Sequence, residues 1–416
     1  MSIHSINQVH GLVYDPIPYA GGSKIATAEM LIAANEIKED SQNVESIPQS
    51  LTFTVLTSDL DSWAPLKKQL DIKIIPLPSW AFLTQPQGYR YWFAQVCLAF
   101  LLMVTLIRIP KVSYFIGASG PGIDMALYVL NMIVHKPVIQ LIHGPVAPSR
   151  SIGYCLTSAQ KVYYLESTFL SISSALTRYY SRQNNSTNAQ SKSSDALTST
   201  RFKSFVNGLS DSRWPTLTRH HSTDVFWAAS LLKWKGLETL VDVVENMDAP
   251  WKTRICYIQP KNTNLGVSQL PNPTDNIHLY HAPANLDEIR AQSGIFVSTS
   301  INEPFGLSVL ESLAAGLCVV IPEDGAYWDL ALQHGIDCLK YNPKDSKSLH
   351  HVLRTLTKNR ALRDTLSEGS LTIASQYRAK HCYLEVCASL LMTTPKIEIP
   401  HNKQYLNDVS ELGDAS

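Results

Sequence analysis

The sequence has little charge of either sign, and the two signs balance. Among its 416 residues, 35 are Lys or Arg and 35 are Asp or Glu, so charged residues make up only 17%. A net charge near zero argues against wholesale attraction to nucleic acid, although it leaves room for a local basic pocket that binds one phosphate group. Apolar residues reach 45%, which allows a large buried core. The length suits two domains of about 200 residues each.

Paired cysteines are also lacking. The seven cysteines are scattered and contain no Cys-x-x-Cys pair: Cys97, Cys155, Cys256, Cys318, Cys338, Cys382 and Cys387. This pattern argues against a zinc site and against a disulfide framework, and it predicts reduced, mostly buried thiols in a cytosolic protein. His10 and His281 stand in no motif and are predicted to be structural.

The sequence has one long apolar run, and the N-terminal "MSIHSINQVHGLVYDP" does not read as a signal peptide. Residues 92–110, "WFAQVCLAFLLMVTLIRIP", contain an apolar run of about 16 residues, which is shorter than the ~20 needed to span a bilayer. We therefore predict a buried helix. A helix on a membrane surface is the alternative, and a spanning helix fits least well.

Short apolar strands alternate with helices along the chain. In the first half, strands are predicted at 51–57, 72–77, 112–117 and 137–144, and helices at 24–38, 89–107 and 122–134. In the second half, strands are predicted at 223–230, 252–260, 276–282, 294–300 and 318–322, and helices at 235–247, at 285–292 and from 346 onward. Alternation of this kind implies parallel sheets, which bind ligands at the carboxyl ends of their strands. The predicted fold class is α/β with two domains.

Composition sets the predicted domain limits. The first domain is placed at 1–222 and the second at 223–372, followed by a C-terminal helix at 373–392. Residues 181–201, "SRQNNSTNAQSKSSDALTSTR", are rich in Ser, Thr, Asn and Gln, so we predict a mobile loop there. Residues 393–416 are predicted to be a loose polar tail.

The stretch "STSINEPFGLSVLESLAAG", residues 298–316, places two glutamates around a helix start. Glu303 precedes a proline, which disfavours helical geometry, so it is predicted to lie in the loop ahead of the helix. Apolar residues then recur at helical spacing, at 307, 310, 313, 314 and 317, which leaves Glu311 off the apolar face. Both carboxylates can then face one crevice. The alternative is helix capping, which would account for two glutamates taken alone.

The start of this predicted helix can bind an anion. The backbone N–H groups of Phe305, Gly306 and Leu307 would lack helical acceptors, and the helix dipole favours negative charge at that end. Gly306 would let a ligand approach the backbone closely. Phosphate on the N–H groups and sugar hydroxyls on the carboxylates together describe a nucleotide sugar.

The pattern "EPFGLSVLE" resembles the signature of the family-four retaining glycosyltransferases: a glutamate, seven residues and a second glutamate, with Phe-Gly-Leu after the first. Four further segments resemble the family in the same order along the chain: "PYAGGSKIA", "VIQLIHG", "FKSFVNGLSD" and "LLKWKGLETLVDVV". The resemblance covers nearly the whole chain and is stronger in the second half. It implies the GT-B fold, in which two Rossmann-like, doubly wound domains face a central cleft. It also implies that the helix at 373–392 packs back on the first domain.

The resemblance implies roles for three residues of the second domain. Glu303 would contact the donor sugar near the reacting carbon and help to stabilise an oxocarbenium-like transition state, and Glu311 would hold the ribose hydroxyls. Lys235 would neutralise the diphosphate, which leaves with extra negative charge. The alternative for Lys235 is a solvated lysine at a helix start.

On the first domain, the resemblance implies that Gly21 and Gly22 let the backbone approach a phosphate or the acceptor. His143 would sit near the reacting carbon or a phosphate oxygen. A plain turn is the alternative for the two glycines, and a core histidine is the alternative for His143.

The sequence departs from the family at one place. A Gly-Arg pair usually precedes the lysine by five to six positions, with the arginine on the diphosphate, but here Ala229 and Ser230 stand there. Serine cannot replace a bidentate cation, so Lys233 is the candidate to reach in instead. The loss implies weaker donor binding, a shifted phosphate grip, or a chain that no longer catalyses.

The sequence therefore predicts a retaining glycosyltransferase. It would move sugar from a nucleotide-diphosphate sugar to a hydroxyl of a glycan or lipid-linked oligosaccharide, in polysaccharide biosynthesis. No metal or other cofactor is expected, because no Asp-x-Asp motif lies in a suitable place. The predicted location is the cytoplasm, with contact to the inner face of a membrane. The alternatives are a non-catalytic partner subunit of the same fold, a sugar-nucleotide epimerase, or a phosphorylase, which would need a longer chain.

Overall fold

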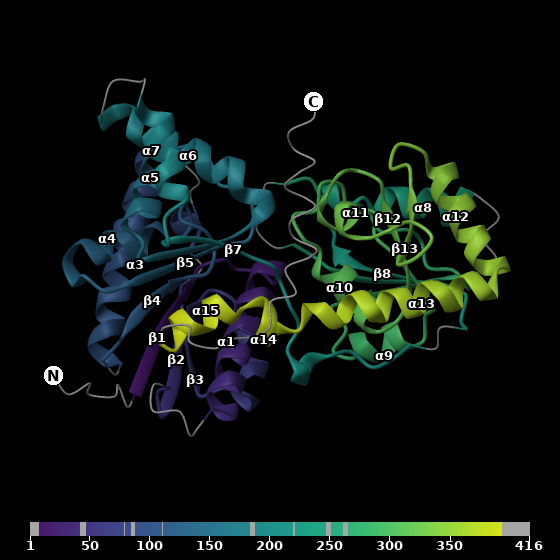
Figure 1. The fold of residues 1–416 in the computed structure, drawn as a ribbon, viewed down its shortest axis with the longest axis horizontal. Coiled ribbons are helices and arrows are strands. Elements are labelled where there is room, and N and C mark those ends of the chain that lie inside the picture. Colours follow the sequence, from purple (N-terminus) through teal and green to yellow (C-terminus); the bar gives the residue numbers. More distant parts are fainter. Residues whose placement is uncertain are drawn as a thin grey trace.

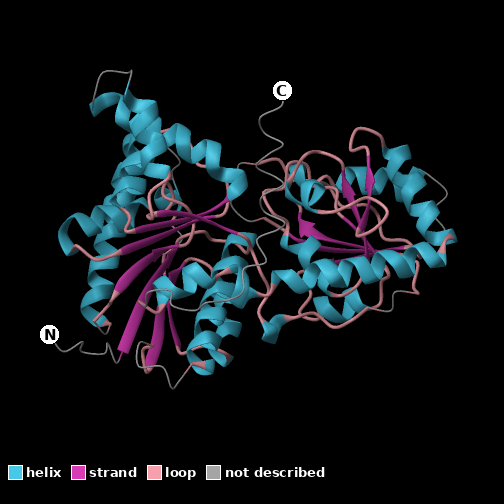
Figure 2. Ribbon diagram, viewed as in Figure 1, coloured by secondary structure: helices cyan, strands magenta, loops and turns pink. Residues whose placement is uncertain are grey.

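A computed structural model describes residues 8–41, 47–78, 80–84, 88–109, 111–183, 188–218, 221–246, 251–260 and 265–392. The chain forms two α/β domains, each built on a parallel sheet with helices on both faces (Figures 1 and 2). The predicted polar tail at 393–416 lies outside the described residues.

The first domain is built on a seven-stranded sheet with the order β3-β2-β1-β4-β5-β6-β7, and its paired strands are all parallel. The strands are β1 (Gln8–Asp15), β2 (Ser50–Thr57), β3 (Ile72–Pro76), β4 (Tyr114–Gly117), β5 (Val138–Ile142), β6 (Lys161–Leu165) and β7 (Phe202–Phe205). The central strands are almost entirely apolar and buried, as expected for a sheet covered on both faces.

Helices cover both faces of this sheet. One face packs against α1 (Gly22–Asp40), and the other packs against α3 (Gly88–Arg108), α4 (Met125–Val134), α5 (Arg150–Ser158) and α6 (Phe169–Gln183). The short α2 (Leu60–Trp63) and α7 (Ala189–Leu197) complete the domain.

The second domain has a six-stranded parallel sheet with the order β10-β9-β8-β11-β12-β13. Its strands are β8 (Val225–Ser230), β9 (Thr253–Ile258), β10 (Ile277–His281), β11 (Ile295–Val297), β12 (Cys318–Pro322) and β13 (Cys338–Tyr341). Its helices are α8 (Leu237–Asn246), α9 (Leu286–Ala291), α10 (Leu307–Ala314), α11 (Tyr327–Ala331), α12 (Ser346–Lys358) and α13 (Arg360–Ala374).

The end of the chain returns to the first domain. Figure 1 shows α14 (Ala379–Cys382) and α15 (Leu384–Leu390) beside α1, after the long α13 of the second domain. Two tyrosines of the first sheet hold this segment: the Tyr114 hydroxyl donates to the Leu390 carbonyl at 2.6 Å, and the Tyr163 hydroxyl donates to the Glu385 carbonyl at 2.7 Å. A continuous apolar core runs through this segment from one domain into the other.

Two predictions of local structure need correction. Residues 181–201 are not one loop, because α6 continues to Gln183 and α7 occupies Ala189–Leu197. The polar composition gave a wrong prediction because α7 buries only a narrow stripe of three residues, Ala189, Ser193 and Leu197. The Ser193 hydroxyl reaches the Ser173 carbonyl of α6 at 3.1 Å, which holds the polar helix in place.

The second correction concerns α3, which is not a fully buried helix. Only 28% of its most apolar window is buried in the protein. By length and composition alone, the helix could cross a membrane. Five of its residues are buried, namely Ala94, Gln95, Leu98, Ala99 and Leu102. The opposite face is apolar and exposed.

Candidate functional site

The carboxyl ends of the second sheet bring Lys235 and Glu303 together. Lys235 follows β8 in a short 3-10 turn, and Glu303 lies in the loop after β11. The lysine ammonium group forms an ion pair with Oε2 of Glu303, and both side chains are largely shielded, with 17% and 18% of their surface exposed. The indole ring of Trp234 lies 4.0 Å from the same ammonium group and adds a cation–π contact. The structure thus joins two residues that lie 68 positions apart.

A chain of hydrogen bonds fixes the backbone beneath this pair. The indole N–H of buried Trp227 donates to the Thr299 hydroxyl at 2.9 Å, and that hydroxyl donates to the Lys235 carbonyl at 2.8 Å. Gly236 follows in the left-handed region, with φ of 68°. A Cβ atom there would lie 2.2 Å from the Thr299 carbonyl oxygen, so the turn requires glycine.

The start of α10 presents unbonded backbone donors beside Glu303. Gly306 caps the helix with φ of 81°, and its carbonyl accepts from the Trp328 indole N–H at 3.1 Å. The N–H groups of residues 305–308 have no acceptor among the described residues. The Phe305 side chain is buried against Tyr327 and Trp328, so it anchors the loop.

Glu311 is held by an arginine that the sequence did not single out. The guanidinium of Arg290, on α9, donates to Oε2 of Glu311 at 2.6 Å and to Asp287 at 3.0 Å. Arg290 is 5% exposed and Glu311 is 19% exposed, so the pair is shielded from solvent. Arg290 therefore holds the second glutamate of the motif in a fixed position. Ser312 and Ala315, which also lie outside the predicted apolar positions, are buried.

Ser230 and Lys233 lie at the carboxyl end of β8 and in the turn that follows it, just before Lys235. Ser230 is the last residue of β8 and is half-buried. Lys233 forms an exposed ion pair with Glu238 of α8 at 2.7 Å. The Lys233 ammonium group therefore contacts α8, whereas the Lys235 ammonium group contacts Glu303.

The first domain contributes His143, at the end of β5, and the glycine pair before α1. His143 Nε2 lies 3.4 Å from the hydroxyl of Thr27, on α1, and its ring meets the edge of Phe205 at a centroid distance of 5.6 Å. Burial lowers the pKa of His143 to about 4, so the ring is neutral near pH 7. Its Nδ1 atom is buried and has no hydrogen-bond partner among the described residues.

Gly21 caps α1 in extended conformation, and a Cβ atom at Gly21 or Gly22 would meet nothing within 4 Å. The open space would admit a ligand beside the backbone. A buried carboxylate that the sequence analysis missed fixes the ends of this loop: Asp15 accepts from Lys24 at 2.6 Å and from the Trp63 indole at 2.8 Å. Lys24 also donates to the Ile17 carbonyl at 2.6 Å, which ties the loop to α1.

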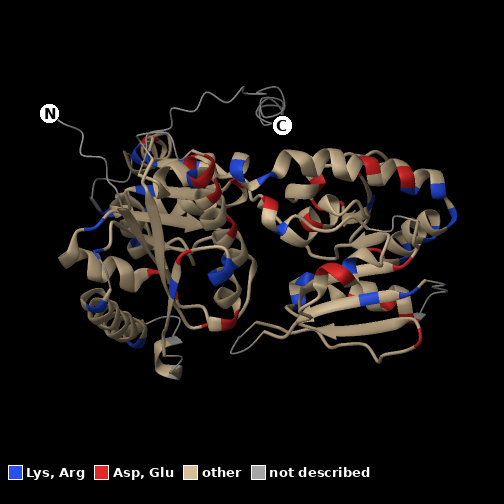
Figure 3. Cartoon of the chain, turned by 90° about the horizontal axis from the view of Figure 1, so that it is seen from below, with Lys and Arg blue, Asp and Glu red and all other residues tan. Residues whose placement is uncertain are grey.

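The carboxyl ends of the two sheets face one another. Ser167, after β6, donates from its hydroxyl to the carbonyl of Pro304, next to Glu303, at 3.2 Å. Glu29 on α1 is buried, which raises its pKa; Arg213 opposes that rise, and Glu311 across the junction adds to it. Figure 3 shows acidic and basic residues on both sides of the junction. Among the described residues, no group of three His, Cys, Asp or Glu side chains could hold a metal ion.

Comparison with known proteins gives one family match and a set of similar structures. Residues 211–371 match the model of the family described as glycosyl transferases group 1. A crystal structure of Anabaena Alr3699/HepE in complex with UDP-glucose is similar over 92% of this chain and 99% of that one, with a TM-score of 0.63 and 14% identity. Sucrose-phosphate synthase from Thermosynechococcus elongatus matches with a TM-score of 0.60 and 12% identity, over 92% of this chain and 97% of that one. Comparison with curated proteins gives no match.

The fold is GT-B. The predicted pair of Rossmann-like domains is confirmed. The group 1 match covers the second GT-B domain, which carries Lys235, Glu303 and Glu311, and it supports a glycosyltransferase. The finer predictions stay predictions: membership of family four, the role of the paired glutamates, and the retaining mechanism.

Proposed function

We propose that this protein is a retaining glycosyltransferase that moves a sugar from a nucleotide-diphosphate sugar to a hydroxyl group of a glycan or a lipid-linked oligosaccharide. The observation that carries the proposal is the ion pair of Lys235 and Glu303 beside the free N–H groups at the start of α10. A cation, backbone donors and a carboxylate at one strand end suit a diphosphate with its sugar.

The donor diphosphate would draw Lys235 from Glu303. In the reaction, the bond between the sugar carbon and the diphosphate oxygen breaks, the acceptor oxygen takes its place, and the acceptor proton passes to the released diphosphate. Lys235 acts where negative charge grows, on the leaving oxygen. Glu303, released from the ion pair, faces the positive charge that develops on the sugar ring.

The contact with Arg290 supports the proposed role of Glu311 in binding the ribose. Because the guanidinium binds Oε2 and fixes that carboxylate in place, Oε1 can accept hydrogen bonds from the ribose hydroxyls. On the first domain, His143 acts as a neutral group, because its lowered pKa of about 4 removes the charge at neutral pH. It would contribute a hydrogen bond to the sugar or the acceptor.

We propose further that the reaction needs no metal and no other cofactor, that it serves polysaccharide biosynthesis, and that the protein is cytoplasmic with contact to the inner face of a membrane. Lys235 and the free N–H groups of α10 would supply the positive field that a divalent ion supplies elsewhere. The exposed apolar face of α3 supports the membrane contact.

The first experiment is thermal unfolding of the purified chain with UDP, GDP, ADP, CDP or dTDP. A nucleotide at about 100 times its Kd stabilises the folded state by ~2.7 kcal/mol. UDP is the first to test, because it is bound in the structures of Alr3699/HepE. Glu311→Gln is the matched control, because the amide keeps the size of the side chain and can still accept from Arg290. Its own unliganded midpoint is the reference, and its shift with nucleotide should shrink.

The second candidate is a non-catalytic partner subunit with the same fold. Ser230, in place of the expected arginine, favours it, because Lys233 pairs with Glu238 and leaves that place without a cation. The same experiment separates the two. A midpoint unchanged by all five nucleotides would favour the partner subunit, and Ser230→Arg would then be the variant to make.

A further inference from the structure

The outer face of the first domain carries an exposed apolar stripe along the whole of α3. Large apolar side chains recur every three or four residues on the side away from the core: Tyr89, Trp92, Phe93, Val96, Phe100, Met103 and Ile107. Tyr89 and Ile107, near the two ends, are 78% and 80% exposed. On the neighbouring α4, Met132 and Ile133 are exposed as well. A contiguous apolar surface of this length marks a contact with a partner or a membrane.

The same part of the chain holds a strong excess of positive charge. Residues 72–194 contain ten Lys or Arg residues but only two acidic residues, Asp124 and Glu166. Because the whole chain is neutral, the remaining residues carry a matching excess of negative charge. Asp124 is fully buried, so Glu166 is the one carboxylate of this segment that reaches solvent among its described residues. An apolar stripe in a basic setting is complementary to an anionic membrane surface.

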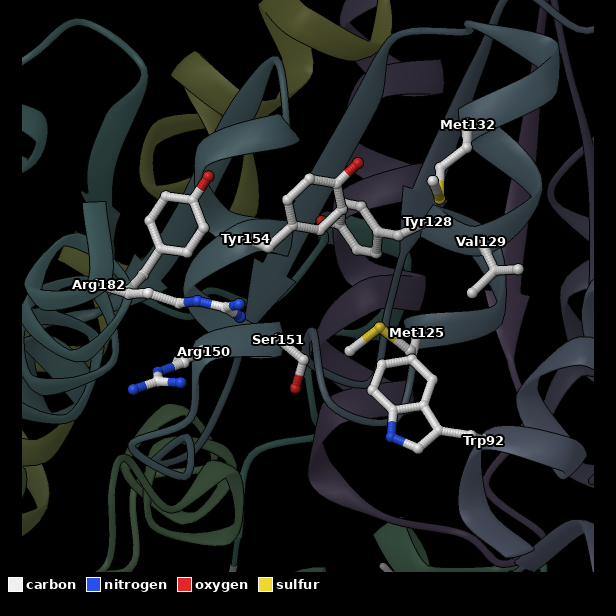
Figure 4. A pocket seen from close by; sticks show the side chains of 10 residues that line it. Trp92, Met125, Tyr128, Val129, Met132, Arg150, Ser151, Tyr154 and Arg182 are labelled. Atoms are coloured by element: carbon white, nitrogen blue, oxygen red, sulfur yellow. The ribbon is translucent and has the colours of Figure 1, made fainter. Parts of the chain in front are cut away.

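A pocket of about 600 Å³ opens beside the stripe, between α3, α4, α5 and α6. Figure 4 shows the guanidinium groups of Arg150 and Arg182 on one side of it and Trp92, Val129 and Met132 on the other. Neither guanidinium has an ion-pair partner or a hydrogen-bond acceptor among the described residues. Arg150 is also the first residue of α5, where the helix dipole favours an anion.

We propose that this face binds a membrane that contains anionic phospholipids. The apolar stripe of α3 inserts among the lipid chains, and the pocket holds one headgroup phosphate on Arg150 and Arg182. Arg150, at the start of α5, follows His143 by seven residues, so the membrane would lie on the acceptor side of the proposed reaction. The inference deepens the proposed membrane contact, but it uses no residue of the donor site.

The test is vesicle flotation of the full chain with phosphatidylcholine alone or with phosphatidylcholine mixed with phosphatidylglycerol, at low and at physiological salt. Each basic group at an anionic surface contributes about a fivefold gain in binding. We expect flotation with the mixed vesicles, and a loss of roughly twentyfold in the double variant Arg150→Gln, Arg182→Gln. The matched control is Arg360→Gln on α13 of the second domain, whose side chain is 68% exposed and which should bind like the unchanged protein.

A second variant tests the stripe. Phe93→Ser with Phe100→Ser removes exposed apolar area without touching the pocket, and it should reduce flotation while keeping the preference for phosphatidylglycerol. Equal binding to both kinds of vesicle, or a double arginine variant that floats like the unchanged protein, would overturn the proposal. So would full competition by inorganic phosphate at matched ionic strength, which would make the pocket a site for soluble phosphate. Nucleotide-dependent thermal shifts of the arginine variant check the donor site separately.

Discussion

The two domains share one architecture but reveal their chemistry in different ways. In the second domain, Glu303 and Glu311 belong to one loop and one helix, so the local sequence already groups them. In the first domain, Thr27 and His143 lie 116 positions apart and meet because α1 begins, and β5 ends, at the same edge of the sheet. The family match accordingly covers residues 211–371 and leaves most of the first domain out. A site built within one loop can be found from sequence, whereas a site built by topology needs the fold.

The domains also differ in the partners that their surfaces suit. The positive excess and the exposed apolar stripe of residues 72–194 belong to the first domain, and the negative excess belongs to the remainder. In the second domain, Lys235 pairs with Glu303 in the loops after β8 and β11, and Arg290 pairs with Glu311 between α9 and α10. We infer that the second domain holds the small charged donor and that the first meets the larger acceptor and the membrane.

The largest predicted effect is a loss of activity caused by a substitution in the second domain. Lys235→Ala removes the cation that faces the leaving diphosphate, and we expect kcat/KM to fall by about 10²–10³, as for the loss of one fixed charge-stabilising donor. Turnover of the sugar nucleotide selected by thermal shift measures it. Lys233→Ala is the matched control, because its ion pair with Glu238 is exposed and worth little. If the two variants lose activity equally, Lys235 has no special role.

A smaller effect, on the free energy of unfolding, should distinguish Gly236 in the second domain from Gly21 in the first. Gly236→Ala forces a side chain into the left-handed region and against the Thr299 carbonyl, so we expect a loss of at least about 2 kcal/mol in the free energy of unfolding. Gly21→Ala has an extended backbone and open space, and should change stability by less than about 1 kcal/mol. Urea unfolding measures both. Equal losses would contradict the distinction between a strained turn and an open loop.

Much of the fold was predictable because apolar strands and helices alternate clearly, as at β2, β9 and β12. Four strands were missed: β1, β6, β7 and β13. β1 is longer, but Gln8, His10 and Gly11 interrupt its apolar run. The other three are short, at four or five residues, and each includes lysine or tyrosine, so the apolar pattern is weak. Pairing with neighbouring strands supplies the stability that the local sequence does not.

The site residues that are close in sequence could be predicted. The residues whose contacts arise from tertiary packing could not. Arg290 looks like an ordinary surface arginine of a helix that is only six residues long, and its burial against Glu311 follows from the way α9 packs. Asp15 is the last residue of β1 and belongs to no motif, yet its carboxylate accepts hydrogen bonds from Lys24 and Trp63. An acidic residue directly after the apolar residues 12–14 is the signal in the sequence that could have pointed to it.

The smallest predicted effect is a change in the free energy of unfolding that depends on His143 and occurs only at acidic pH. Its pKa is about 4 in the folded protein, because burial disfavours the charged ring, and about 6.5 in the unfolded chain. Between these values the unfolded chain binds more protons, so stability should fall as the pH falls from about 6.5 towards 4. His143→Gln removes this contribution. We expect the difference in unfolding free energy between the two proteins to change by about 1–2 kcal/mol across that window, allowing for partial solvent access. Urea unfolding at several pH values measures it. A difference that is independent of pH would mean that His143 does not sit in the desolvated position at the end of β5, and the first domain would then lack the neutral polar group that the proposed reaction assigns to it.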